Sequence, residues 1–314
     1  MPNIWTHNIY GNCLLEKLEL TGLLDRDKGK QLFQLGCQGP DFLFYHRFWP
    51  WQKKSVMNEL GSRMHKEHCG PVIGHMAEYL LTANKTLQDP ETLYLLGFIS
   101  HHLLDRNLHP YIFLKSGFRK WNHQRFEVML DTVMVKKLLH KETWRIPVWR
   151  EIYIGEGFPN GILEMLNNMR QRFFPEYGES PDAARWNEAY RDMVKAQKIF
   201  HDPYKIKTIL TLRQIDPLVY KRKLPPVDLM NEAKAPWHDP TSKNMVSDKS
   251  VWELWDLALA DGMAVLTPVV ELFKDKHASA DRLAQFALTL DNISYETGKP
   301  LDSGSEILYE DPII

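Results

Sequence analysis

Two short segments of the sequence repeat histidine and carboxylate residues at every fourth position, and this repeat limits the possible folds. The first segment contains His101, Asp105 and His109, and the second contains His123 and Glu127. Each residue of an α-helix turns by about 100°, so residues four positions apart differ by only about 40° and share one face. The spacing therefore predicts two helices with ionisable side chains on facing sides.

Such side chains are a typical ligand set for a divalent metal ion. Their neighbours, such as Phe98 and Leu103, are apolar, and burial of ionisable groups without a partner is costly. Imidazoles and carboxylates bind zinc at roughly 2.0–2.2 Å, and Mn, Fe or Ni use the same groups. A single pair is more typical of a surface ion pair or a core histidine, but two pairs joined in register by His109 favour metal. His102 lies off the shared face, where it has a supporting contact or no role.

Composition argues against a nucleic-acid-binding surface. The chain of 314 residues has 39 Lys and Arg residues against 40 Asp and Glu residues. No overall basic field is therefore available for a long nucleic acid, although a small nucleotide is not excluded. Hydrophobic residues make up 44% and charged residues 25% of the chain, which is ordinary for a globular protein.

The beginning of the chain and the cysteines bear on its location. Residues 1–7 lack the basic and apolar regions of a secretion signal. No stretch approaches the ~18 consecutive apolar residues of a spanning helix. Cys13, Cys37 and Cys69 are odd in number and widely spaced, which argues against a disulfide framework. We expect a cytoplasmic protein without an integral membrane segment.

Helical periodicity recurs along the chain, whereas strand-like alternation is not sustained. We expect an all-α fold, a compact multi-helix bundle with a metal site between helices and little or no sheet. Residues 1–314 are expected to form a single domain with a metal-binding core at about 1–140. One helix opens at Asp89 and Pro90, ends near Pro110 and is followed by a turn over 111–120. The predicted helices are 14–24, 55–66, 71–83, 90–108, 121–140, 160–172, 182–200, 250–273 and 279–292.

Three segments are predicted to be irregular. Residues 201–247 are rich in proline and form a long connection. Within it, Trp237, His238 and Asp239 either cap an active site or form a surface turn. The tail, 298–314, has little pattern.

A loop is predicted at residues 36–41, because glycine and proline interrupt the periodicity there. From this loop Asp41 is a candidate metal ligand or general base. The alternative is an N-cap or Asx-turn aspartate. Aromatic residues are dense between 42 and 51, where they line a lipid or base pocket or belong to the core.

Together, these residues resemble the zinc-dependent phospholipase C family, an all-helical fold shared with single-strand-specific zinc nucleases. The resemblance covers roughly the first 130 residues. It rests on His101-x3-Asp105, His109, His123-x3-Glu127, Gly39-Pro40-Asp41 and Met64-His65.

The resemblance implies a centre of two or three zinc ions. Zinc lowers the pKa of a bound water towards about 7, and the water would attack a phosphoester. Asp41 would be the general base, and Asp105 is the second candidate catalytic residue. The implied ligands are Asp41, His65, His101 and Asp105 for one ion, His109, His123 and Glu127 for a second, and His7 with a bridging Asp105 for a third.

Departures from the family pattern leave alternatives open. Asp105 and His109 are two residues closer together than in the family, so His109 could instead serve the first ion. Secreted members use the amine of an amino-terminal tryptophan, whereas Trp5 is internal; an amine exposed by removal of Met1 is the alternative. The segment before His65 is longer than in the secreted enzymes, and the substitutes for His65 are His46, His68 and His75.

The function favoured by these residues is a metal-dependent phosphoester hydrolase of phospholipase C type. Its partner would be a small phosphoester or a phospholipid headgroup. One alternative is a nuclease- or nucleotidase-like zinc hydrolase, and another is a non-catalytic protein stabilised by metal. Phe42, Tyr45, Trp49 and Trp51 are compatible with a headgroup pocket or a base-stacking platform.

Overall fold

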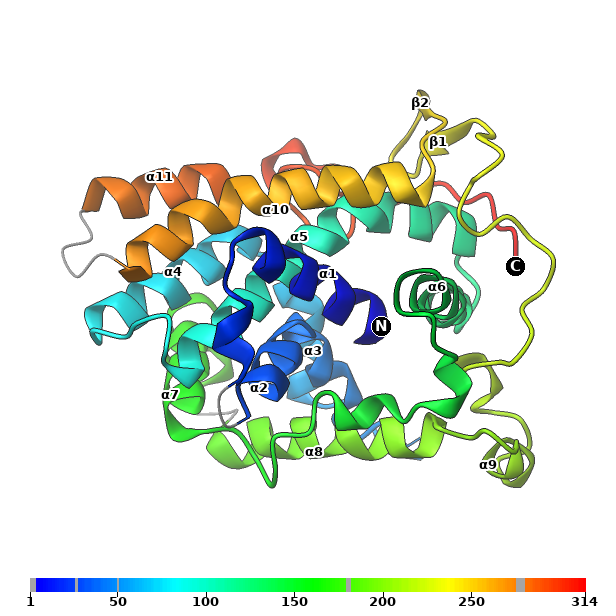
Figure 1. Cartoon of the computed structure of the whole chain (residues 1–314), viewed down its shortest axis with the longest axis horizontal. Helices are drawn as coiled ribbons and strands as arrows, with labels where there is room; N and C mark the ends of the chain where they lie inside the picture. Colours follow the sequence, from blue (N-terminus) through cyan, green and yellow to red (C-terminus); the bar gives the residue numbers. More distant parts are fainter. Residues whose placement is uncertain (1–3, 26–27, 50, 179–181, 275–279) are drawn as a thin grey trace.

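The chain folds as a bundle of helices around one long central helix (Figure 1). The computed structural model describes residues 4–25, 28–49, 51–178, 182–274 and 280–314. The α-helices are α1 (Ile4–Lys17), α2 (Gly29–Gly36), α3 (Val56–Met64), α4 (Cys69–Thr82), α5 (Pro90–Ser116), α6 (Asn122–Leu139), α7 (Asn160–Phe173), α8 (Ala183–Phe200), α9 (Ile206–Leu210), α10 (Val251–Lys274) and α11 (Ala280–Leu290). The strands β1 (Trp237–Asp239) and β2 (Ser242–Ser247) pair in an antiparallel hairpin.

Helix α5 is the scaffold on which the other elements pack. Its side chains are buried on every side, among them Leu95, Phe98, Ile99 and Leu103. A helix that is apolar all round is stable only when other elements surround it. Helices α1, α2, α4, α6, α7 and α10 all contact α5, so its polar residues face the interior of the bundle as well.

Two glycines let the backbones of α2 and α5 approach closely. A Cβ atom on Gly36 would lie 2.2 Å from the carbonyl oxygen of Tyr94, and one on Gly97 would lie 2.2 Å from that of Phe33. Side chains other than hydrogen are therefore excluded at this crossing. The contact places the 3-10 helix η2 (Gly39–Tyr45), which directly follows α2, beside α5.

The all-α prediction is confirmed, but two helix boundaries in the amino-terminal half were wrong. The first helix runs over Ile4–Lys17 rather than 14–24, because its buried polar residues His7 and Asn8 hide the apolar pattern. Helix α5 continues past Pro110 to Ser116, so the predicted turn at 111–120 is wrong at its start. Proline costs about 3 kcal/mol inside a helix, and burial of Tyr111, Ile112 and Leu114 offsets this.

Other predictions are corrected in detail. The predicted loop at 36–41 ends in the 3-10 helix η2, and α2 and α9 were not predicted. The start of the last predicted helix, 279, lies outside the described residues. Trp237, His238 and Asp239 form strand β1, and the Trp237 ring contacts Tyr111 at the end of α5, with ring centroids 5.3 Å apart. None of the described helices has the length and apolar character needed to cross a membrane.

Candidate metal centre

Among the described residues, three groups of His, Asp and Glu side chains bring their ligand atoms within 4.8 Å of one another. They come from α1, η2, the end of α3, α5 and α6, and all but His123 are buried. All eight residues predicted from the sequence belong to these groups. The groups are Asp41, His65 and His101; His7, His101 and Asp105; and His109, His123 and Glu127.

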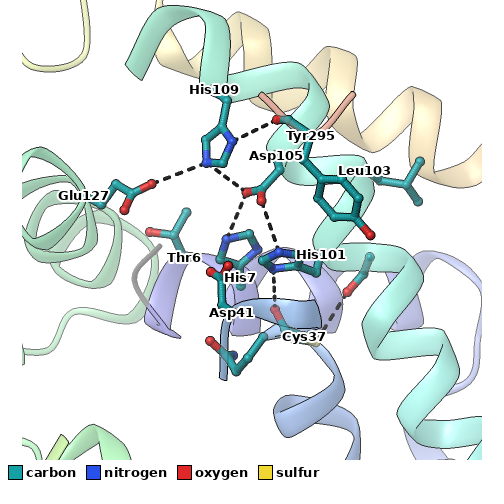
Figure 2. Close-up of polar contacts among 12 residues, drawn as sticks. Thr6, His7, Cys37, Asp41, His101, Leu103, Asp105, His109, Glu127 and Tyr295 are labelled. Carbon is teal, nitrogen blue, oxygen red and sulfur yellow. Dashed lines mark hydrogen bonds and ion pairs between the residues drawn. The ribbon is translucent and has the colours of Figure 1, made fainter. Parts of the chain in front are cut away.

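Asp105 lies between the groups and faces them with different oxygens (Figure 2). Its Oδ2 is 3.1 Å from Nε2 of His101. Its Oδ1 is 3.2 Å from Nε2 of His7 and 3.2 Å from Nε2 of His109. One carboxylate thus has an oxygen available to each of two neighbouring positions, which is the arrangement of a bridging ligand.

His109 lies close to the other two members of its group, Glu127 and His123. Its Nε2 is 3.4 Å from Oε1 of Glu127, and Nε2 of His123 is 3.0 Å from the same oxygen. His109 therefore connects α5 to the ligand atoms of α6, while Asp105 lies on its other side (Figure 2). This geometry favours the assignment of His109 to the group that contains His123.

Backbone carbonyls fix the orientation of three imidazole rings. Nδ1 of His65 donates to the carbonyl of Gly61 at 2.7 Å, and Nδ1 of His101 donates to that of Cys37 at 3.1 Å. Nδ1 of His109 donates to the carbonyl of Tyr295 at 2.8 Å. A carbonyl can only accept, so in the neutral ring the proton is on Nδ1 and Nε2 presents a lone pair.

These lone pairs face carboxylate oxygens, which fits a bound cation. Nε2 of His65 is 3.0 Å from Oδ1 of Asp41. Both Asp41 carboxylate oxygens, Oδ2 of Asp105 and Nε2 of His101 are buried and have no hydrogen-bond partner in the described structure. Acceptors that face each other at about 3 Å repel unless a proton or a metal ion lies between them. The donor set therefore fits a divalent metal ion, with imidazole nitrogen and carboxylate oxygen as ligands.

The ionisable side chains of the cluster shift one another's pKa values. Burial acts to raise the pKa of Asp105, but the rings of His101, His109 and His7 hold it well below its usual value. Burial acts to lower the pKa of His109, whereas Asp105 and Glu127 raise it to about 9. In the absence of metal His109 thus holds a proton at neutral pH, and metal binding would release it.

The histidines weighed as substitutes for His65 lie elsewhere. His46 contacts Ser55 and Glu188 through its two ring nitrogens. His75 bonds to Asn168, and His68 packs its ring against Phe173. His102 uses Nε2 to bond the carbonyl of Ile293. None of these four belongs to the three groups among the described residues. Residues 1–3, and with them the amine considered after removal of Met1, lie outside that part of the chain.

Two supporting residues were missed from the sequence. Asp131 is fully buried and accepts hydrogen bonds from the amides of Trp5 and Thr6, the Thr6 hydroxyl and the Tyr220 hydroxyl. It thereby anchors the start of α1, directly before His7. The signal was available, since Asp131 continues the four-residue series of His123 and Glu127. Tyr295, whose ring also packs 4.9 Å from that of His65, lies in a region without a recognisable pattern.

A small cavity lies between α1, α5 and α6. It has a volume of about 20 Å³ and is lined by Thr6, His7, Asp105, His109 and Glu127 together with aliphatic residues. This is enough for about one water molecule or ion. Apart from Thr6, the polar lining consists of side chains that belong to two of the three groups, so the cavity is part of the same centre.

The family model described as zinc dependent phospholipase C matches residues 6–171 of the chain. This range covers more than half of the 314 residues and includes all three groups. No curated protein and no solved structure gives a significant match to the chain. The family match and the three groups together support a zinc hydrolase.

Proposed function

The chain belongs to the zinc-dependent phospholipase C family, and we propose from this that it hydrolyses a phosphodiester at a centre of two or three zinc ions. The main support is the position of Asp105, which faces His101 with one oxygen and His7 and His109 with the other. A carboxylate shared in this way suits a cluster of ions better than an isolated structural ion with its own four ligands.

In this proposal each ion has its own set of side chains, except that Asp105 is shared between the first and the third. When bound, zinc would act as a Lewis acid and lower the pKa of a water molecule bound to it. Because His101 uses Nδ1 to bond Cys37, only its Nε2 is free to act as a ligand, so it serves a single ion. The proposed ligands are Asp41, His65, His101 and Asp105 for the first ion, His109, His123 and Glu127 for the second, and His7 with Asp105 for a third.

Asp41 is the residue we assign as general base. Its side chain is presented by η2 and faces Nε2 of His65, and both of its oxygens are without a hydrogen-bond donor in the described structure. An oxygen without a donor can accept a proton from the attacking water. The new P–O bond then forms as the bond to the leaving alcohol breaks. The proton on Asp41 is available to that alcohol, so the products are a phosphomonoester and an alcohol.

The proposed substrate is a small phosphoester or a phospholipid headgroup. A base-binding site would need exposed aromatic faces, but two of the candidate aromatic residues are in the core. Phe42 packs against Phe158 with ring centroids 5.4 Å apart, and the Tyr45 hydroxyl accepts a hydrogen bond from Gln197. Phe42 and Tyr45 are therefore not available to stack on a base, which weakens the case for the nuclease-like alternative.

We also propose that the whole chain works as one unit. The carbonyl of Tyr295, far beyond the family match, holds the ring of His109. Arg106 on α5 donates to both oxygens of Asp261 on α10, at 2.7 and 2.5 Å. The carboxy-terminal part thus supports the metal centre instead of forming a separate body.

The test is hydrolysis of a phosphodiester panel by zinc-loaded protein. The panel should contain p-nitrophenyl phosphorylcholine, dispersed phospholipid, a dinucleotide and a single-stranded oligonucleotide. We expect turnover of the first two, and a loss of about 10²–10⁴-fold in Asp41→Asn. Glu91→Gln is the matched control, since Glu91 is a buried carboxylate on α5 that pairs with Lys85 away from the centre. Cleavage of the nucleotides alone would favour the nuclease-like alternative, and no cleavage by the zinc-loaded protein would overturn the proposal.

A further inference from the structure

A short protruding segment around α9 buries two polar residues and exposes its large apolar residues. Large apolar side chains are exposed along it, whereas Thr208 and Asp202 are only 4% and 6% exposed. In Figure 1, α9 lies at the edge of the molecule, beyond the end of α8. The exposed side chains are Tyr204 (82%), Ile206 (59%), Ile209 (69%), Leu210 (77%) and Leu212 (84%).

Hydrogen bonds hold this inverted arrangement in place. Oδ2 of Asp202 accepts from the amide of Thr208 at 2.7 Å and from its hydroxyl at 2.8 Å. Nζ of Lys207 donates to the carbonyls of Lys198 at 2.7 Å and His201 at 2.8 Å. Because these polar groups occupy the inner side of the segment, the aliphatic side chains are fixed outward. A contiguous exposed apolar patch of this kind marks a surface that binds a partner.

The surroundings of the patch are basic although the chain as a whole has a net charge of −1. Residues 195–223 contain eight Lys and Arg residues and two Asp residues. Of the two aspartates, Asp202 is buried and Asp216 forms an ion pair with Lys221 at 2.7 Å. The basic residues are Lys195, Lys198, Lys205, Lys207, Arg213, Lys221, Arg222 and Lys223. The local charge therefore suits an anionic partner.

Aromatic rings adjoin the same basic side chains. Nζ of Lys198 lies 4.6 Å from the ring centroid of Trp149 and 5.4 Å from that of Tyr153, which is 39% exposed. Nζ of Lys195 lies 5.5 Å from the ring of Trp49, and this ring stacks on Trp51, which is 75% exposed. Tryptophan and tyrosine with lysine beside them are typical of the headgroup level of a bilayer.

We propose that this surface, the α9 face, docks onto the surface of an anionic phospholipid bilayer. The α9 face comprises Tyr204, Ile206, Ile209, Leu210 and Leu212 with the basic and aromatic residues around them. The aliphatic side chains enter the boundary between headgroups and acyl chains, and exposed basic residues such as Lys205 and Arg213 bind lipid phosphates. The aliphatic and basic residues of the face lie outside the residues of the family match, 6–171, whereas its aromatic residues Trp49, Trp51, Trp149 and Tyr153 lie within that range. Docking does not require hydrolysis. Only the purpose of docking, which is to bring a phospholipid to the metal centre, rests on the proposed function.

The test is co-sedimentation of the full chain with vesicles of phosphatidylcholine alone or mixed with phosphatidylserine. We expect binding to the mixed vesicles that weakens with added salt. In the double variant Leu210→Glu, Leu212→Glu we expect affinity to fall about tenfold or more, because carboxylates oppose insertion and anionic lipid. Leu288→Glu is the matched control, since Leu288 is 74% exposed on α11 at the opposite end of the molecule (Figure 1); it should bind as the original chain does.

Three results would overturn the proposal. The chain could fail to bind either kind of vesicle, or the double variant could bind as well as the Leu288→Glu control. Sedimentation without lipid could instead show a dimer that the double variant abolishes, which would make a second copy the partner of the α9 face.

Hydrolysis of p-nitrophenyl phosphorylcholine is measured on the same samples. Vesicle binding without hydrolysis by zinc-loaded protein would refute the proposed function and leave the docking proposal standing.

Discussion

Replacement of Gly39 by alanine tests the packing that joins η2 to the metal centre. Gly39 has a φ of +49°, and a Cβ atom there would lie 2.1 Å from Cδ2 of the His101 ring. The left-handed backbone costs an alanine about 1–2 kcal/mol, and the overpacking costs about 1–3 kcal/mol more. We therefore expect Gly39→Ala to destabilise the metal-free protein by about 2–5 kcal/mol. For a chain of 314 residues this lowers Tm by about 3–8 °C.

The variant Gly304→Ala separates the cost of the left-handed backbone from the cost of overpacking. Gly304 has a similar φ of +61°, but an added Cβ would meet no atom within 4 Å, so only the backbone cost applies. Thermal unfolding measures the stability of both variants, and titration with zinc measures their affinity. Because the alanine displaces the His101 ring, we expect zinc affinity to fall about 10–100-fold in Gly39→Ala and to stay unchanged in Gly304→Ala. Equal stability and equal zinc affinity in the two variants would refute this account of the packing.

Three further outcomes are expected. Burial lowers the pKa of His102 to about 3, so its neutral ring stabilises the fold above pH 6.5 and this contribution is lost on acidification. His102→Gln should therefore reduce the loss of stability between pH 7 and pH 5 by about 2 kcal/mol in urea unfolding. Removal of zinc with a chelator should lower Tm in calorimetry, and added zinc should restore it, because bound metal stabilises only the folded state. Asp131→Asn should cost about 1–3 kcal/mol in the same urea assay, because the amides of Trp5 and Thr6 lose a carboxylate acceptor; unchanged stability would contradict its anchoring role.

The α5 and α6 parts of the centre could be predicted because helical spacing is a local property. His101, Asp105 and His109 share a face in any α-helix, and the structure places them together. Asp41 and His65 lie on other elements. The loop at 36–41 made Asp41 a candidate ligand or base, whereas only the resemblance to a family brought His65 into the prediction. Long-range contacts of this kind depend on how elements pack, which spacing does not encode.

Other features of the structure could not be predicted from the sequence, for different physical reasons. Buried polar residues, such as His7 and Asn8 in α1, disrupt the apolar pattern on which helix prediction relies. The carbonyl of Tyr295 acts through its backbone, and any residue type could supply it. The α9 face has the opposite pattern to a folded core, with Ile209 outside and Thr208 inside, so its exposure appears only in the structure.

The most direct test of a multi-zinc centre is the zinc content of the protein, measured by elemental analysis after purification without added metal. The account predicts about two or three zinc ions per chain, and at least one fewer in Asp105→Asn, because Asp105 faces three histidines of the centre. The control variant Glu91→Gln, which removes a buried carboxylate on the same helix, should keep the full content. One ion or none, with the same content in Asp105→Asn, would contradict the account.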